Sequence, residues 1–195
     1  MRLLVGIPAY GDWSPEMGAS LALTMAKLAS DPGQIESVRL TRSESTIISE
    51  GRADLVKDAL SSNATHLLWV DADMKFQPSN VSRLLSHDLD IVAATYRKRR
   101  PPHDMTAKDT NGEEIKAGAG DVIEAARIGL GLAVTRVSVF ERLAEPWFAT
   151  PWIEASETSL GEDVFFCSKA RAHGLNVFVD PDASIGVGHV GKAIY

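Results

Sequence analysis

Two aspartates stand one residue apart after an apolar run in the stretch HLLWVDADMKF, residues 66–76. A packed core disfavours two carboxylates at such a position. On an extended strand, alternate side chains point to the same face, so Asp71 and Asp73 can reach one site. Mg²⁺ and Mn²⁺ prefer oxygen ligands and often bridge a carboxylate to substrate phosphates. The pair therefore predicts a divalent-metal site, with a solvent-exposed strand end as the plain alternative.

A phosphatase is the competing chemistry for this motif. In haloacid-dehalogenase-type phosphatases the first aspartate of D-x-D is the nucleophile, and a threonine or valine stands two residues after the second. The corresponding residue here is Lys75, and the motif follows the third predicted strand, whereas in those phosphatases it follows the first. Both differences disfavour the phosphatase.

A second acidic pair, Glu162 and Asp163, opens a predicted helix in LGEDVFF. The N-terminus of a helix favours ionised carboxylates, so either acid could serve as the base for an incoming hydroxyl. The alternative is a capping box, in which Ser159 and Glu162 only satisfy backbone N–H groups at the helix end.

Three further features could contribute to a site. His189, in the glycine-rich stretch GVGHVG, could complete an aspartate site for Mn²⁺, although a lone histidine is more often structural. The four consecutive cations 97–100 could neutralise a diphosphate or an anionic acceptor, or form a solvated loop. The aromatic side chains of Trp147, Phe148 and Trp152 could line a sugar site or pack in the core.

Alternating strands and helices must position these residues. The first helix has Ser14 as its predicted N-cap and Pro15 at its first position, and Asp31, Pro32 and Gly33 are predicted to end it. The β-α-β order predicts a parallel sheet covered by helices, with ligands beyond the carboxyl ends of the strands. The predicted strands are 2–10, 35–41, 66–73 and 90–97, and the predicted helices are 14–30, 49–63 and 78–88.

The pattern changes near residue 97, where turn residues become frequent. Asn111-Gly112 predicts a hairpin turn. The remaining predicted elements are a strand at 127–136, a short helix at 137–144, a helix from 161 and a strand at 176–183. A chain of 195 residues is long enough for one sizeable core, so we expect one domain, 1–195.

Composition limits the classes of protein. Apolar content of 45% with 24% charged residues is ordinary for a globular protein. The net charge of −6 argues against nucleic-acid binding. The single cysteine, Cys167, excludes an internal disulfide framework. Since neither a signal peptide nor a transmembrane segment is evident, we expect a cytoplasmic protein.

The order of these motifs resembles that of nucleotide-sugar-dependent glycosyltransferases with the GT-A fold, family-2-like and containing D-x-D. The matching pieces are IPAY, GRADLVKDAL, HLLWVDADMKF, DIVAATYRK, IGLGLAVTRVSVFERL, GEDVFFCSKARAHGLNVFVDPD and GHVG. The resemblance implies an α/β single-domain fold with a mixed, mostly parallel central sheet flanked by helices. Residues 1–97 would form its nucleotide-binding half and residues 98–195 its acceptor-side half.

The resemblance also implies roles on the donor side. The first strand's end would line the pocket for the nucleotide base, the second helix would lie near the donor nucleotide, and two glycines would form a wall beside the donor sugar. The corresponding residues are Pro8, Ala9, Tyr10, Arg52, Gly129 and Gly131.

For the metal, the resemblance implies Asp73 as the firm ligand that bridges to the diphosphate. Asp71 would contact the ribose or the metal, and His189 would be a further metal ligand. Glu162 and Asp163 match the acidic pair at the acceptor side, where inverting enzymes keep their base.

The implied activity is a metal-dependent hexosyl transfer from a UDP- or GDP-sugar to the hydroxyl of a glycan, lipid-linked or protein acceptor, with Mn²⁺ or Mg²⁺. Three alternatives remain: a D-x-D phosphohydrolase, a sugar nucleotidyltransferase and a non-catalytic nucleotide-sugar-binding domain. The nucleotidyltransferase is disfavoured because no G-x-G-x-x-x-R loop follows the first strand.

Overall fold

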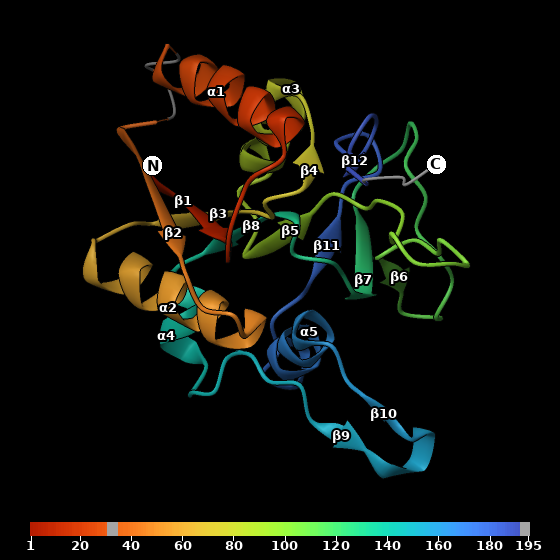
Figure 1. Ribbon diagram of the computed structural model, residues 1–195. Helices are drawn as coiled ribbons and strands as arrows, with labels where there is room; N and C mark the ends of the chain where they lie inside the picture. Colours follow the sequence, from red (N-terminus) through yellow and green to blue (C-terminus); the bar gives the residue numbers. More distant parts are fainter. Residues whose placement is uncertain (31–34, 192–195) are drawn as a thin grey trace.

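A central sheet carries the strands whose ends form the site. The computed structural model describes residues 1–30 and 35–191, and within these residues the sheet has the strand order β2-β1-β3-β8-β5-β11-β7-β6 (Figure 1). The strands are β1 (Arg2–Pro8), β2 (Ser37–Ser43), β3 (His66–Val70), β5 (Ile91–Ala93), β6 (Lys108–Asp109), β7 (Ile123–Arg127), β8 (Leu132–Arg136) and β11 (Phe178–Val179).

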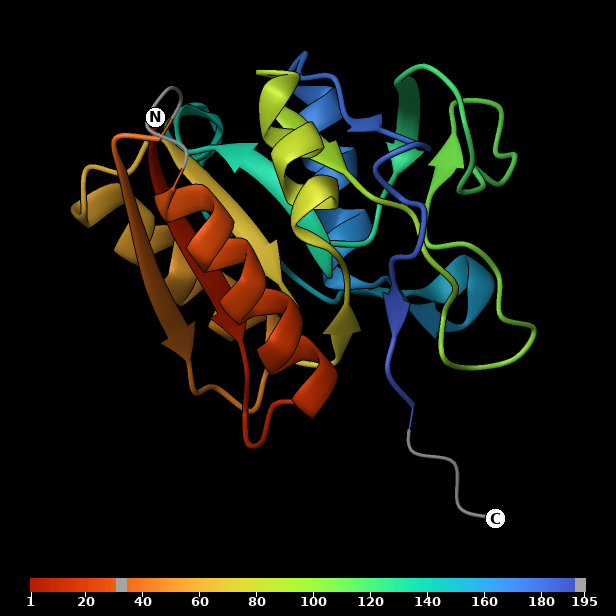
Figure 2. The ribbon, with the colours of Figure 1, turned by 90° about the horizontal axis from the view of Figure 1, so that it is seen from above.

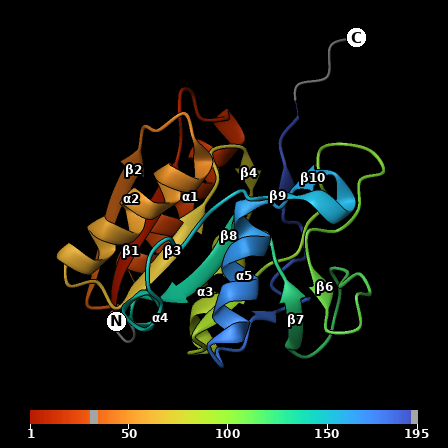
Figure 3. The same ribbon diagram turned by 90° about the horizontal axis from the view of Figure 1, so that it is seen from below.

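Helices cover both faces of this sheet. One face is covered by α1 (Pro15–Ala29) and α3 (Pro78–Ser86), as Figure 2 shows. The other is covered by α2 (Ile48–Ser61), α4 (Ser138–Arg142) and α5 (Glu162–Ala172), which Figure 3 shows from below. Because helices lie on both sides, β3 is buried along its whole length, which explains its run of apolar residues.

The strand directions confirm a mixed α/β sheet. β1 pairs in parallel with β2 and β3, and β5 pairs in parallel with β11. β8 lies between β3 and β5 and is antiparallel to both, and β7 is antiparallel to β11 and β6. Most strands of the sheet therefore run in one direction, so their carboxyl ends face the same side.

Two local predictions are confirmed. Ser14 is the N-cap of α1, and its Oγ accepts the Met17 N–H at 3.1 Å. The turn at Asn111-Gly112 forms with Gly112 at φ +88°, a backbone conformation that favours glycine. The residues predicted to end the first helix, 31–33, lie outside the described residues.

The predicted strand 127–136 is wrong as one element. The chain forms β7 and β8 separately, with a break at residues 128–131. The break follows from the approach of Tyr96, whose hydroxyl accepts the Gly131 N–H at 2.7 Å. The Gly131 N–H is therefore not available for pairing with another strand.

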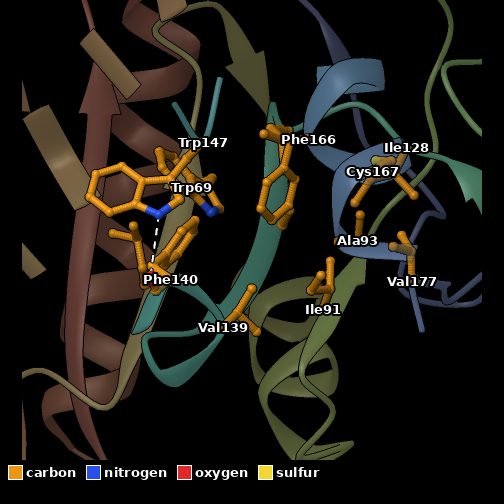
Figure 4. Close-up of a cluster of buried hydrophobic side chains, with 14 of the residues drawn as sticks. Trp69, Ile91, Ala93, Ile128, Val139, Phe140, Trp147, Phe166, Cys167 and Val177 are labelled. Carbon is orange, nitrogen blue, oxygen red and sulfur yellow. Dashed lines mark hydrogen bonds between the residues drawn. The ribbon is translucent and has the colours of Figure 1, made fainter. Parts of the chain in front are cut away.

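The aromatic residues divide between the core and the surface. Trp147 and Phe148 are buried, and the Trp147 indole donates to the carbonyl of Leu143 at 2.8 Å. Figure 4 shows Trp69, Phe140, Trp147 and Phe166 gathered in this core. Trp152 instead lies on β9 (Trp152–Ile153), which pairs with β10 (Thr158–Ser159), and is 61% exposed. Core packing is therefore the role of Trp147 and Phe148.

A buried carboxylate ends the last strand of the sheet. β11 stops at Val179, short of the predicted 176–183, because Asp180 accepts the N–H groups of Asp182 and Ala183 at 2.8 and 3.0 Å. Arg83 and His87 of the α3 region donate to the same carboxylate at 2.6 and 2.5 Å. Burial raises the pKa of Asp180, but these hydrogen bonds lower it by more, so the pKa lies below its ordinary value.

We expect Asp180→Asn to destabilise the fold at neutral pH by about 3 kcal/mol, because an amide cannot accept from all these donors. Since the carboxyl pKa is depressed in the folded state, its stabilising contribution is present above the unfolded pKa of about 3.9 and is lost on further acidification. Urea unfolding of wild type and variant between pH 7 and 2.5 measures this difference. Asp182→Asn is the control, because its partly exposed ion pair with Arg83 spans 3.4 Å. An equal loss in both variants would contradict the prediction.

Candidate functional site

A cleft of about 1870 Å³ opens beyond the carboxyl ends of β1, β3 and β5. Ligand pockets commonly measure roughly 300–1,000 Å³, so this cleft has room for a nucleoside diphosphate together with a sugar. Six residues predicted from the sequence line it: Pro8, Ala9, Tyr10, Asp71, Asp73 and His189. Five others lie outside its lining: Arg52, Gly129, Gly131, Glu162 and Asp163.

The two aspartates lie in a turn. β3 ends at Val70, and the Met74 N–H donates to the Asp71 carbonyl at 3.1 Å, which closes a turn over residues 71–74. The expectation that both carboxylates share one face of an extended strand is therefore wrong. Both still line the cleft, and each carboxylate is paired with a different arginine.

Asp71 is held by a buried arginine. Arg52 Nη2 donates to its two carboxylate oxygens at 3.0 and 3.3 Å, and Arg52 Nε donates to Glu162 Oε1 at 3.2 Å. The Arg52 side chain is 3% exposed, and its guanidinium carbon lies 5.6 Å from the centroid of the Trp69 ring. Burial lowers the pKa of Arg52, but Asp71 and Glu162 raise it by more, so the guanidinium stays charged.

Asp73 is held by an exposed arginine. Arg99 Nη1 lies 2.8 Å from Asp73 Oδ2, and the Arg99 side chain extends from the loop that follows β5. An exposed ion pair contributes little free energy, about 0–1 kcal/mol, so a divalent cation can displace this arginine. The sequence indicated a cationic run at 97–100, but no pattern in it paired one of these residues with Asp73.

The pairing of two short strands places His189 opposite Met74, the residue that follows Asp73. β12 (Gly188–His189) pairs with β4 (Met74–Lys75), and the Val190 N–H donates to the Asp73 carbonyl at 2.7 Å. His189 Nδ1 lies 2.9 Å from the carbonyl of Arg97, so it carries the hydrogen and donates. In the neutral ring this leaves Nε2 with a free lone pair, the usual arrangement of a metal-binding histidine.

The Asp73 carboxylate and the His189 imidazole are ligand types that suit a divalent cation to which a substrate also binds. Within residues 1–30 and 35–191, no group of three or more His, Cys, Asp or Glu side chains could hold a metal ion. Asp73 and His189 offer one carboxylate and one imidazole, while Asp71 is engaged by Arg52. Mg²⁺ usually binds through one or two carboxylates and completes its shell with phosphate oxygens and water. An ion at Asp73 and His189 would therefore need further ligands from a substrate or from water.

The acidic pair lies at the start of α5. The N-cap is Gly161, without a side-chain cap, and Glu162 accepts from Arg52, so the alternative of a capping box with Ser159 is wrong. Asp163 Oδ1 accepts the Val164 N–H at 2.7 Å. Burial, followed by the negative charge of Glu162, raises the pKa of Asp163 above its ordinary value. Asp163 is thus suited to taking up a proton.

Tyr96 explains both glycines of the IGLGL stretch. A Cβ at Gly131 would lie 2.9 Å from the Tyr96 ring carbon Cζ, and one at Gly129 would lie 2.7 Å from the hydroxyl oxygen. Burial, followed by the charge of Asp71, raises the pKa of Tyr96 well above its ordinary value, so the phenol stays neutral. No pattern in the sequence distinguishes Tyr96, which stands in DIVAATYRK at the end of a predicted apolar strand.

Comparison with known proteins supports the fold. No protein-family model and no curated protein matches the chain. Among the solved structures that match, the crystal structure of A197 from STIV has a TM-score of 0.63 and 16% identity, covering 100% of this chain and 97% of that chain. The crystal structure of GalNAc-T7 with UDP, GalNAc and Mn²⁺ has a TM-score of 0.61 and 13% identity, covering 98% of this chain and 44% of that chain. The chain therefore has a GT-A-like α/β fold and spans less than half of GalNAc-T7.

We expect Gly131→Ala to destabilise the protein by about 1–3 kcal/mol, because its Cβ overlaps the buried Tyr96 ring. The matched control is Gly18→Ala in α1, where no atom lies within 4 Å of the added Cβ. In a helix interior this change stabilises by about 0.5–1 kcal/mol. Urea unfolding of the two variants should give opposite signs, and destabilisation by neither would refute the steric account.

Proposed function

We propose that this protein is a metal-dependent glycosyltransferase that moves a hexosyl group from a UDP- or GDP-sugar to an acceptor hydroxyl. The observation that carries the proposal is that Asp71, Asp73 and His189 line the same cleft as the end of β1. The similarity to GalNAc-T7, crystallised with UDP, GalNAc and Mn²⁺, supports it through the fold.

The donor nucleotide is proposed to bind where β1 ends. Pro8 and Ala9 are buried, and Tyr10 is 75% exposed at the cleft, free to stack on a base. The Ala9 N–H donates to the Ser43 carbonyl at 3.2 Å, which fixes the backbone of this wall. In this proposal residues 1–97 mainly serve the donor and residues 98–195 mainly the acceptor, with Gly129 and Gly131 beside the donor sugar.

The diphosphate is proposed to lie beside Asp73 and His189, which would hold Mn²⁺ or Mg²⁺. The ion would act as a Lewis acid for the charge that develops on the departing nucleoside diphosphate. Arg99 would have to leave Asp73 when the ion binds, and Lys98 stands at the cleft as a cation for the phosphate oxygens. Exclusion of water by this loop would limit hydrolysis of the donor.

The acceptor hydroxyl is proposed to lose its proton to Asp163. Its raised pKa brings this carboxyl closer to the working pH, which is the property required of a general base. Glu162 is engaged by Arg52 and supplies the negative charge that contributes to this shift. The roles of the two acids therefore differ, with Asp163 as the base and Glu162 as its charged neighbour.

The proposal predicts metal-dependent nucleotide binding. We expect UDP or GDP to raise the melting temperature only when Mn²⁺ is present, because an ion held by Asp73 would offset the charge of the diphosphate. Asp73→Ala should abolish the shift, and Arg99→Ala should lower the Mn²⁺ concentration needed for it, because the competing cation is gone. Asp12→Asn, another carboxylate of the cleft, is the control. Binding without metal, or no binding by any nucleoside diphosphate, would overturn the metal site.

Transfer should require ionised Asp163. The base accepts a proton only when it is deprotonated, so the rate should fall as the pH drops through the raised pKa of Asp163. Glu162→Gln removes the charge that raises this pKa and should move the acidic limb to lower pH. Asp163→Asn should reduce transfer by about 10²-fold or more. Measured rates from pH 4 to 9 test both variants, and full activity of Asp163→Asn would exclude this base.

A further inference from the structure

We propose that Arg52 is a positioning residue that couples the donor side of the site to its acceptor side without touching either substrate. This inference rests on the proposed function. The family resemblance implies that Arg52 lies near the donor nucleotide. Because the Arg52 side chain is 3% exposed and does not line the cleft, we infer an indirect role in place of a direct contact. Arg52 acts through Asp71 at the cleft and through Glu162 beside Asp163.

The packing of α2 fixes this arginine. Arg52 continues the buried stripe of Leu55, Val56 and Ala59, so the sheet-facing side of the helix ends in a guanidinium. Gly51 lets the helix approach β2, because a Cβ there would lie 2.7 Å from Ser43 Oγ. The Trp69 ring lies against the guanidinium, and its indole N–H donates to Thr135 Oγ1 at 3.0 Å.

One guanidinium serves two carboxylates that belong to different parts of the site. Asp71 lies in the turn after β3, and Glu162 is the first residue of α5, 110 positions along the chain from Arg52. Arg52 donates two hydrogen bonds to Asp71 and one to Glu162 from a single planar guanidinium group. A movement of this group toward one carboxylate therefore weakens its hydrogen bonding to the other. Arg52 Nη1 is buried with no hydrogen-bond partner among the described residues.

In this proposal, a change at Asp71 on the donor side alters the charge beside Asp163 on the acceptor side. A bound donor nucleotide that draws the Asp71 carboxylate toward the cleft would weaken the Arg52–Asp71 contacts, and Arg52 would then bind Glu162 more closely. Fuller neutralisation of Glu162 lowers the negative charge beside Asp163, which adjusts the proposed base when donor is present. A lysine could not reproduce the coupling, because an ammonium group lacks the planar fork that spans both carboxylates.

The test is a double-mutant cycle on nucleotide affinity, measured by titration calorimetry with UDP and Mn²⁺ in the absence of acceptor. With Arg52 present, Glu162→Gln should weaken binding by about threefold or more, because Arg52 then has only Asp71 to neutralise. In the Arg52→Gln background, the same Glu162→Gln change should alter affinity by less than about 1.5-fold. Glu157→Gln, on the exposed β9–β10 connection, is the control for loss of one negative charge.

Equal effects of Glu162→Gln in both backgrounds, or no effect in either, would overturn the coupling. Where Arg52→Gln fails to fold, Arg52→Lys takes its place, because it keeps the charge without the fork. Absence of UDP binding in the wild type would overturn the proposed function by itself. In that event, thermal unfolding of Asp71→Asn, Glu162→Gln and the double variant still tests the network, and additive effects would show that Arg52 does not link the two acids.

Discussion

A buried positive charge between two carboxylates holds the site together. Removing Arg52 from water is costly, and the ionised forms of Asp71 and Glu162 offset that cost only while both remain close to the guanidinium. The turn after β3 and the start of α5 are therefore held at fixed positions relative to α2. Because the aromatic core lies directly beneath, with Trp69 against Arg52 and Phe166 of α5 stacked on Phe140, packing and electrostatics reinforce the same arrangement.

Periodicity and turn chemistry made much of the fold predictable. The apolar runs and the Ser14 cap locate β1, α1 and β3, and the order of strands and helices places the D-x-D turn at the edge of the sheet where the cleft opens. For the same reason, the residues after β1 and β3 could be placed at this edge, where they line the cleft. Local signals of this kind depend on neighbouring residues, which one sequence displays directly.

Contacts between distant segments could not be predicted in this way. The pairing of Arg99 with Asp73, the bridge from Arg52 to Glu162 and the approach of Tyr96 to Gly131 all join residues far apart in the chain. The same limit explains the wrong single strand at 127–136, since its glycines make room for a side chain from another segment. The capping box failed because α5 starts two residues later than that motif requires: Gly161 is the N-cap, Glu162 is the first helical residue, and Ser159 lies in β10.

The short pairing of β12 with β4 has a consequence for biosynthesis. Asp73 leaves the ribosome well before His189, because translation proceeds from the N-terminal side. Until Gly188 and His189 pair with Met74 and Lys75, the nascent chain presents the aspartate turn without its histidine. The two sides of the proposed cation site can therefore come together only after residues 188–189 have been synthesised, although the aspartate turn is made much earlier.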